Sequence, residues 1–383
     1  MIRIKGTEVP PKKKLGLIVN PIAGMGGRVG LKGTDGQKTL EMARDLGAIP
    51  TAPQRAIEAL QRLTRISESF DLFTYPDEMG GEEARQCNFE PRIIGSIASG
   101  KTTSSDTKKA AKEMASLGVD LILFAGGDGT ARDICEAVGD RLLVLGIPAG
   151  VKIQSAVFAV NPRAAGDLAA QYLEVEGTAT HLAEVMDIDE DAFRDNRISA
   201  KLFGYLKVPY EETMIQGAKV GTPLDEQEEA EAIASDLMES WQDDYLYILG
   251  PGTTLRAVAE KLGVAKTLLG VDIVYGRELV ATDVNEKQLL ELIEGKKAKI
   301  LVTVIGGQGF IFGRGSQQIS PEVIRKVGRE NVVVVTTPNK LVALRGRSLL
   351  VDTGDRQVDE MMSGYIRVIT GYRRRAVYQV KSD

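Results

Sequence analysis

One carboxylate stands inside a run of small residues, Gly126-Gly127-Asp128-Gly129-Thr130. Glycine has no Cβ, so the backbone N–H groups of such a run can approach phosphate oxygens closely. A carboxylate among these donors would repel phosphate unless it binds Mg²⁺ or accepts a proton. The run therefore predicts phosphoryl transfer, with Asp128 as the chemical residue.

The residues around this run predict the elements that position it. Residues 121–125 are apolar and indicate a buried strand, while Ile134, Ala137 and Val138 have helical spacing and indicate a helix over 131–138. The glycines then form a tight turn between strand and helix. A structural alternative is that they serve only to reverse the chain, although an aspartate between glycines gains little from packing.

The other residue types narrow the chemistry. The chain has one histidine, His181, so a His-rich zinc site or a Ser-His-Asp triad has little support, and a general base at neutral pH would be a carboxylate. Cys87 and Cys135 are too few for a thiolate metal cluster or a disulfide framework. We therefore predict no cluster of metal-ligating side chains.

Composition limits the partners. A net charge of −5 without a long basic run argues against a protein built to bind nucleic acid, and a small-molecule substrate is expected instead. The N-terminal residues contain no signal-peptide h-region, and no apolar run approaches the roughly 20 residues of a membrane span. We expect a cytoplasmic protein that does not bind membranes.

A second glycine-rich segment follows the first apolar strand, residues 15–19. It reads "NPIAGMGGRVGLKGTDG" and has six glycines within thirteen residues, a composition that favours a loop over a ligand or a mobile surface segment. Asn20, Gly24 and Gly26 are the residues of this loop that we predict to contact a nucleotide.

Residues 95–102, "GSIASGKT", match the phosphate-binding pattern G-x-x-x-x-G-K-[ST] letter for letter. In that interpretation Lys101 would bind phosphates and Thr102 would bind Mg²⁺. The preceding residues include Glu90, Pro91 and Arg92, which fit a buried central strand poorly. We therefore expect Thr102 or Thr103 to contact phosphate within another fold, and a P-loop NTPase remains an alternative.

Strands alternate with helices along both halves of the chain, which predicts α/β architecture with parallel strands. In the first half the pattern indicates helices over 37–47 and 53–69 and a strand near 92–97. Residues 181–210 look rich in strands, and 225–244 look like an amphipathic helix.

A second α/β series begins at Tyr245. The C-terminal residues alternate like a hairpin, with strand 376–380 at its edge and Arg373 to Arg375 as charges that discourage aggregation. We predict two domains, 1–175 and 176–383.

Two motifs in order, "IVNPIAG" and "FAGGDGTARD", resemble the NAD kinase and diacylglycerol kinase superfamily. The segments "GVDLILFAGGDGTARDI" and "GIPAGVKIQSAVFAVNP" are most similar to the ATP-NAD kinase-like branch that includes the acetoin-catabolism X proteins. The resemblance covers Leu15 to about Ala170. It implies a Rossmann-like N-terminal domain, followed by a second mixed α/β domain, and a homo-oligomer that uses ATP and Mg²⁺.

The resemblance also implies residue roles. Asp128 would be oriented on the acceptor hydroxyl, and Gly126, Gly127, Gly129 and Thr130 would shape the nucleotide site. Lys152, in "GVKIQS", is the candidate cation near the phosphates. An equally good interpretation is that Lys152 is a surface lysine after a turn.

The second half departs from characterised NAD kinases. It has no evident Asn-Asp or Asn-Glu pair that would hold NAD, since Asn285-Glu286 stands at a helix start and fits a cap. The segments "GPGTT" (250–254), "IGGQGFIFGRG" (305–315) and "DTGD" (352–355) are expected to line the acceptor side.

The resemblance therefore implies an ATP-dependent kinase that phosphorylates the 2′-hydroxyl of the adenosine ribose of NAD, giving NADP, or a related small molecule. The alternatives are a kinase of a different small-molecule alcohol and a non-catalytic regulatory protein that binds NAD or ATP. The sequence does not distinguish ATP from polyphosphate as the phosphoryl donor.

Overall fold

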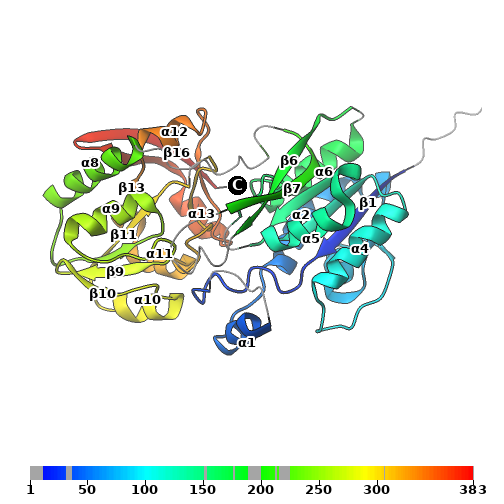
Figure 1. Ribbon diagram of the computed structural model, residues 1–383, viewed down its shortest axis with the longest axis horizontal. Helices are drawn as coiled ribbons and strands as arrows, with labels where there is room; N and C mark the ends of the chain where they lie inside the picture. The colour runs from blue at the N-terminus through cyan, green and yellow to red at the C-terminus, as the bar shows by residue number, and fades with distance from the viewer. Residues whose placement is uncertain are drawn as a thin grey trace, which may run out of the picture.

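The chain folds into two α/β domains that lie side by side (Figure 1). The computed structural model describes residues 12–31, 37–150, 153–175, 177–188, 200–211, 214, 225–305 and 307–382. The first domain is blue to green in Figure 1, and most of the second domain is yellow to red. This arrangement confirms the predicted fold class, a Rossmann-like parallel sheet followed by a second mixed α/β domain.

The first domain is built on a five-stranded parallel sheet in the order β3-β2-β1-β4-β5. β1 and β4 lie in its middle, and both are almost entirely buried. The strands are β1 (Lys13–Val19), β2 (Phe70–Thr74), β3 (Arg92–Ile93), β4 (Leu121–Gly126) and β5 (Val144–Pro148).

Helices cover both faces of the first sheet. One apolar core joins α2 and α6 to the sheet through side chains such as Leu60 and Leu168. The other joins α4 and α5 through Met114 and Ile134. The helices of this domain are α1 (Gln37–Asp45), α2 (Ala52–Leu63), α3 (Gly81–Gln86), α4 (Ser104–Ser116), α5 (Asp128–Val138) and α6 (Pro162–Glu174).

An antiparallel pair, β6 (Thr180–Ile188) and β7 (Ala200–Pro209), packs on the α5 side of the first sheet. Its inward residues, Val185 and Leu206 among them, join the same core as α4 and α5. The strand-rich character predicted for residues 181–210 is confirmed for 181–188 and 200–209, and residues 189–199 lie outside the described part of the chain. The predicted domain boundary between residues 175 and 176 remains a prediction.

The second domain contains a mixed nine-stranded sheet in the order β10-β9-β8-β11-β13-β15-β16-β14-β12. β8, β11, β13 and β15 are parallel to one another, so their carboxyl ends lie at one edge. The strands are β8 (Leu246–Leu249), β9 (Asp272–Tyr275), β10 (Glu278–Ala281), β11 (Ala298–Thr303), β12 (Phe310–Phe312), β13 (Val332–Val335), β14 (Leu349–Val351), β15 (Gly364–Gly371) and β16 (Arg374–Ser382).

Both faces of this sheet are also covered. Leu237 and Val258 belong to one apolar core, and Leu289, Ile324 and Val358 belong to the other. The helices are α8 (Asp225–Glu239), α9 (Thr253–Leu262), α10 (Glu286–Ile293), α11 (Pro321–Val327), α12 (Pro338–Val342) and α13 (Arg356–Met362).

Two features of the first sheet differ from the sequence prediction. β2, which pairs directly with β1, was not predicted. The helical pattern expected over 53–69 is present as α2, which ends at Leu63, followed by a 3-10 helix over Thr64–Ser69. The strand expected near 92–97 comprises only Arg92 and Ile93, both exposed at the sheet edge. The acidic Asp71 interrupts the apolar residues of β2, which made a buried strand hard to recognise.

The prediction for the C-terminal hairpin was wrong in one respect. β15 and β16 do pair as an antiparallel hairpin, but β16 also pairs with β14 and is therefore internal to the sheet. Arg375 does not protect an edge, because its Nη2 lies 2.6 Å from Oδ2 of Asp236, a buried residue of α8. The arginine therefore fixes α8 against the hairpin.

Glu83 gives the first domain a pH-dependent stability. It lies on α3 with 3% of its surface exposed, and its Oε2 has no hydrogen-bond partner among the described residues. Burial raises the pKa of its carboxyl from 4.5 to about 7. Between these values the folded protein is protonated there and the unfolded chain is not, so stability is lost as the pH rises through this window.

We expect Glu83→Gln to remove this loss. At pH 8 the free energy of unfolding should rise by up to about 3 kcal/mol relative to wild type, with no gain at pH 4. Urea denaturation across this pH range measures the effect, with Glu90→Gln, an exposed residue, as the control. Equal pH profiles for wild type and Glu83→Gln would contradict the assignment.

Candidate functional site

Asp128 is the first residue of α5, directly after the buried strand β4. The helix begins three residues earlier than predicted, because Gly127 is the N-cap and Asp128 to Thr130 already belong to the first turn. The N–H groups of a first helical turn lack intrahelical partners, and the helix dipole places partial positive charge there. This end of the helix can therefore bind an anion.

Backbone amides hold both oxygens of the Asp128 carboxylate. The N–H of Gln154 donates to Oδ2 at 2.8 Å, and the N–H of Ser155 donates to Oδ1 at 3.0 Å. Hydrogen bonds to both oxygens fix the orientation of a carboxylate. The segment after β5 thus fixes the orientation of the Asp128 carboxylate.

Asn20 connects the first loop to this helix. Its Nδ2 donates to Oγ1 of Thr130 at 2.9 Å, and its backbone N–H donates to the carbonyl of Ala125 at 3.0 Å. The carboxyl ends of the neighbouring parallel strands β1 and β4 bring these residues together. The two motifs that carried the family resemblance are therefore joined by a direct hydrogen bond.

Several loop residues approach one another too closely to accept a side chain. A Cβ on Gly126 would lie 2.3 Å from Oγ1 of Thr130, and one on Gly150 would lie 2.8 Å from Cα of Gly127. Gly24 has a φ of +82°, and a Cβ there would lie 1.9 Å from Oγ1 of Thr51. The glycines at these positions let three loops meet around Asp128.

The loops border a cleft of about 1180 Å³. Most of the sequence-predicted site residues line it: Asn20, Gly24, Thr102, Thr103, Gly127, Asp128, Gly129 and Thr130. Gly26 and Gly126 are not among the lining residues, and Gly126 instead accepts hydrogen bonds through its carbonyl from Ala149 and Gly150. Lys152 lies outside the described residues. The binding of a nucleotide by these residues remains a prediction.

Sequence reasoning missed a cation in this cleft. Arg132 lines it together with Lys101 and Arg44. Arg132 follows Asp128 by four residues on α5, a spacing that places the two residues on one helix face. The four-residue spacing is the feature of the sequence that could have identified Arg132 as a site residue.

The P-loop-like segment has a different geometry from a P-loop. β3 before it is exposed, and α4 begins only at Ser104. The Gly100 N–H and the Ser99 hydroxyl donate to the Glu78 carboxylate at 2.6 and 2.9 Å, so a carboxylate already holds these donors. Thr103 is the N-cap of α4 and bonds to Asp106. This arrangement does not favour a P-loop NTPase.

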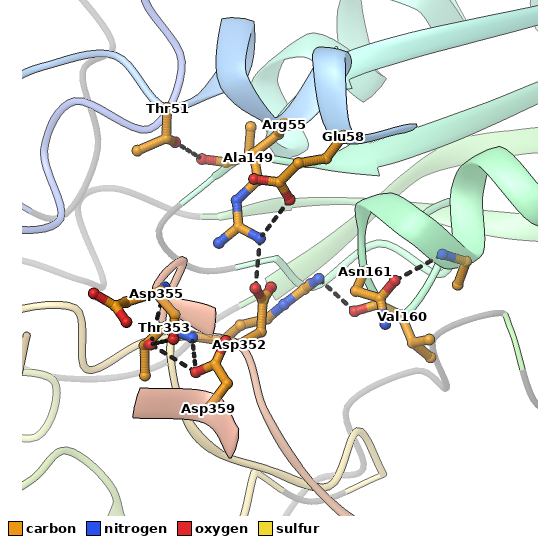
Figure 2. A network of polar contacts seen from close by, with 12 residues as sticks. Thr51, Arg55, Glu58, Ala149, Val160, Asn161, Asp352, Thr353, Asp355 and Asp359 are labelled. Atoms are coloured by element: carbon orange, nitrogen blue, oxygen red, sulfur yellow. Dashed lines mark hydrogen bonds and ion pairs between the residues drawn. The ribbon is translucent and has the colours of Figure 1, made fainter. Parts of the chain in front are cut away.

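The second domain contacts the first near this site. Arg55 of α2 forms an ion pair with Asp352, with 2.5 Å between Nη1 and Oδ1 (Figure 2). Gln308 donates from Nε2 to the carbonyl of Ile153 at 3.1 Å, and Arg314 donates from Nη2 to the carbonyl of Val160 at 2.7 Å. These residues come from the 305–315 and 352–355 segments, which were expected to line the acceptor side.

The first loop also contacts the second domain. The N–H of Glu286 donates to the carbonyl of Arg28 at 3.1 Å, and a Cβ on Gly27 would overlap the side chain of Gln317. Asn285 caps α10 through a hydrogen bond from the N–H of Gln288, which agrees with its interpretation as a cap. The 250–254 segment leads into α9. Its Thr254 hydroxyl accepts a hydrogen bond from Lys340 of α12 at 3.0 Å.

Comparison with known families identifies two matches in order along the chain. Residues 15–177 match the model described as the ATP-NAD kinase N-terminal domain, and residues 242–380 match the ATP-NAD kinase C-terminal domain. A search of curated proteins gives no significant match. No helix in the described part of the chain has the length and apolarity to cross a membrane.

Solved structures give weaker similarities. Two are described as a "putative diacylglycerol kinase from Bacillus anthracis str. Sterne". One is 19% identical over 46% of each chain, the other is 18% identical over 48% of each chain, and both have a TM-score of 0.25. The chain thus spans less than half the length of these structures, and the superposition is too weak to bear on function.

We expect the close approach of Gly150 to Gly127 to be required for nucleotide affinity. A methyl group in Gly150→Ala would displace the backbone at the start of α5 and weaken the binding of ATP by about tenfold or more. Isothermal titration calorimetry measures the dissociation constant, and thermal unfolding shows whether the variant is folded. Gly127→Ala, whose Cβ would lie 3.1 Å from Gly150 Cα, should have the smaller effect. A folded Gly150→Ala protein with unchanged affinity would contradict this role.

Proposed function

The chain belongs to the ATP-NAD kinase family, and from this premise we propose that it transfers a phosphoryl group from ATP to a hydroxyl of NAD or a related small molecule. The observation that supports the proposal best is the fixed orientation of Asp128 at the N-terminus of α5. In the narrow form of the proposal the acceptor is the 2′-hydroxyl of the adenosine ribose, and the product is NADP.

The Asp128 carboxylate suits the role of proton acceptor. A ribose hydroxyl is too weakly acidic to ionise before the reaction, but in a loose phosphoryl-transfer transition state its proton can move to an aligned carboxylate. The acceptor oxygen forms a bond to the γ-phosphorus as the bond from that phosphorus to the bridging oxygen breaks. ADP leaves with the electron pair of the broken bond, and Asp128 holds the proton.

The loops around Asp128 suit the phosphates. The first turn of α5 directs its N–H groups to the cleft, and Arg132 and Lys101 supply positive charge there. Glycines allow the backbone to approach the oxygens. Preorganised donors of this kind stabilise the charge of the transition state more than they stabilise the substrate.

The residues present fit Mg²⁺ that arrives with the nucleotide. No group of three or more His, Cys, Asp or Glu side chains among the described residues is placed to hold a metal ion. Mg²⁺ keeps several waters and binds through phosphates and one or two carboxylates, so it does not require such a group. Asp128 and Thr130 are among the oxygen-bearing side chains that line the cleft. The ion would neutralise charge on the phosphates.

A proton-accepting Asp128 requires an acceptor that carries a hydroxyl, and more than one molecule meets this requirement. Asn285 acts as a helix cap, so an Asn-Glu pair that would hold NAD is not supported at 285–286. A different small-molecule alcohol is therefore the second candidate acceptor. A regulatory module that binds NAD or ATP without turnover would leave the orientation of Asp128 without a use. A cytoplasmic homo-oligomer remains part of the proposal.

Incubation with ATP, Mg²⁺ and NAD, followed by an NADP-specific dehydrogenase assay, tests the narrow form. We expect NADP from the wild type and a loss of roughly 10²- to 10⁴-fold in kcat for Asp128→Asn, because the amide cannot accept the proton. ATP should bind both proteins with similar affinity.

The other outcomes separate the alternatives. Without NADP, ATP consumption in a screen of small alcohols and sugars would keep the kinase and exclude NAD as the acceptor. A thermal shift with ATP but no product from any acceptor would support the regulatory module. Undiminished turnover by Asp128→Asn would exclude Asp128 as the base.

A further inference from the structure

Arg314 of the second domain is buried at the contact with the first domain. It follows β12, and only 6% of its surface is exposed. Nη2 donates to the carbonyl of Val160 at 2.7 Å, and the guanidinium carbon lies 4.6 Å from the centre of the Phe310 ring. Nη1 is buried as well and has no hydrogen-bond partner among the described residues.

This arrangement is costly for a residue with a purely structural role. A buried N–H group without an acceptor loses its hydration and gains no hydrogen bond, and the penalty is larger when the group is charged. Burial lowers the pKa of Arg314 to about 9, while the carboxylates of Asp352 and Asp128 act in the opposite direction. The side chain therefore lies within the electrostatic influence of Asp128.

Asp352, the carboxylate with the larger electrostatic effect on Arg314, already has an ion-pair partner. Asp352 forms its ion pair with Arg55 (Figure 2). Its charge also acts on Arg314, so one carboxylate serves two guanidinium groups. The positive charge of Arg55 repels the charged form of Arg314 and so lowers the pKa of Arg314. An added anion at this contact would relieve the repulsion between the two cations and supply an acceptor for Nη1.

The segment that carries Arg314 is aligned on the Asp128 site by a second contact. Gln308 donates to the carbonyl of Ile153, and the next two residues of that segment, Gln154 and Ser155, hold the Asp128 carboxylate. Gln308 and Arg314 flank β12 on the same chain segment. The second domain thus contacts the segment that holds Asp128, and the same second-domain segment carries Arg314.

We propose that Arg314 binds the phosphoryl group that is transferred at Asp128, so that the second domain completes the phosphoryl-transfer site. The inference rests on the proposed function and names a residue for it. Nη1 would donate to an equatorial oxygen of the phosphoryl group, whose negative charge persists while the bond to the bridging oxygen breaks and the bond to the acceptor forms. Arg314 itself gains or loses no covalent bond or proton.

ADP with beryllium fluoride tests this role without knowledge of the acceptor, because the fluoride complex mimics the transferred phosphoryl group beside ADP. The experiment measures the dissociation constant of ADP with Mg²⁺, with and without beryllium fluoride, for the full chain. In the wild type we expect beryllium fluoride to tighten ADP binding. In Arg314→Met this tightening should fall by about tenfold or more, while the affinity for ADP alone changes less than about threefold.

Arg347→Met is the matched control. Arg347 is also a partly buried second-domain arginine that donates to backbone carbonyls, those of Leu344 and Gly307. Its bonds stay within the second domain, so the beryllium fluoride effect should persist. Arg314→Lys keeps the charge but loses the planar fork of donors, and it should show an intermediate effect.

Each outcome decides between the two claims. If ADP does not bind to the wild type, the proposed function fails. If ADP binds and beryllium fluoride tightens ADP binding equally in the wild type and in Arg314→Met, the inference about Arg314 is overturned and the proposed function stands. The same conclusion follows if beryllium fluoride tightens ADP binding in neither protein. If Arg314→Met does not fold, Arg314→Lys decides, and an unchanged beryllium fluoride effect in that variant overturns the inference.

Discussion

The two hydrogen bonds from Gln154 and Ser155 to the Asp128 carboxylate are the interaction on which the rest of the site depends. A free carboxylate at a helix N-terminus could turn toward the helix amides and occupy the place of a phosphate. Two separate backbone amides, those of Gln154 and Ser155, fix both oxygens of the carboxylate. The same pair of bonds connects the segment after β5 to the segment after β4.

The support of Asp128 belongs to both domains. Residues 153–155 come from the first domain, but the carbonyl of Ile153 accepts a hydrogen bond from Gln308 of the second. The Arg55–Asp352 ion pair and the contact between Arg28 and Glu286 join the domains at other points around the same site. A movement of one domain against the other would therefore change the geometry at Asp128.

The sheets explain why these loops meet. In a parallel sheet the loops after neighbouring strands lie at one edge, and β1, β4 and β5 bring Asn20, Gly127 and Gly150 together there. Close approach at that edge is possible because glycines stand where side chains would overlap. The second sheet presents its own carboxyl edge, where Thr254 and Lys340 are in contact.

Much of this could be predicted from the sequence. The alternation of apolar runs with helical periodicity predicted both α/β domains, and the glycines around Asp128 predicted the strand-to-helix turn. The apolar pattern did not predict β2, because Asp71 interrupts its short apolar run. It also did not predict that β16 lies inside the sheet, because pairing with β14 leaves no local signal in the sequence.

The sequence pointed to the 305–315 segment of the second domain, but it could not predict the contacts that the segment makes with the first domain. Gln308 and Arg314 donate to backbone carbonyls more than 150 residues away. A carbonyl is present at every residue, so such a bond leaves no complementary residue type to recognise. Arg132 was different, since its spacing from Asp128 on one helix could have indicated it.

A crystal structure of the chain with Mg²⁺ and a non-hydrolysable ATP analogue is the most direct test of the central claim. The account predicts that the phosphates lie at the first turn of α5, with the γ-phosphate beside the Asp128 carboxylate. Phosphates bound by the loop at residues 95–102, with Asp128 away from the nucleotide, would contradict it.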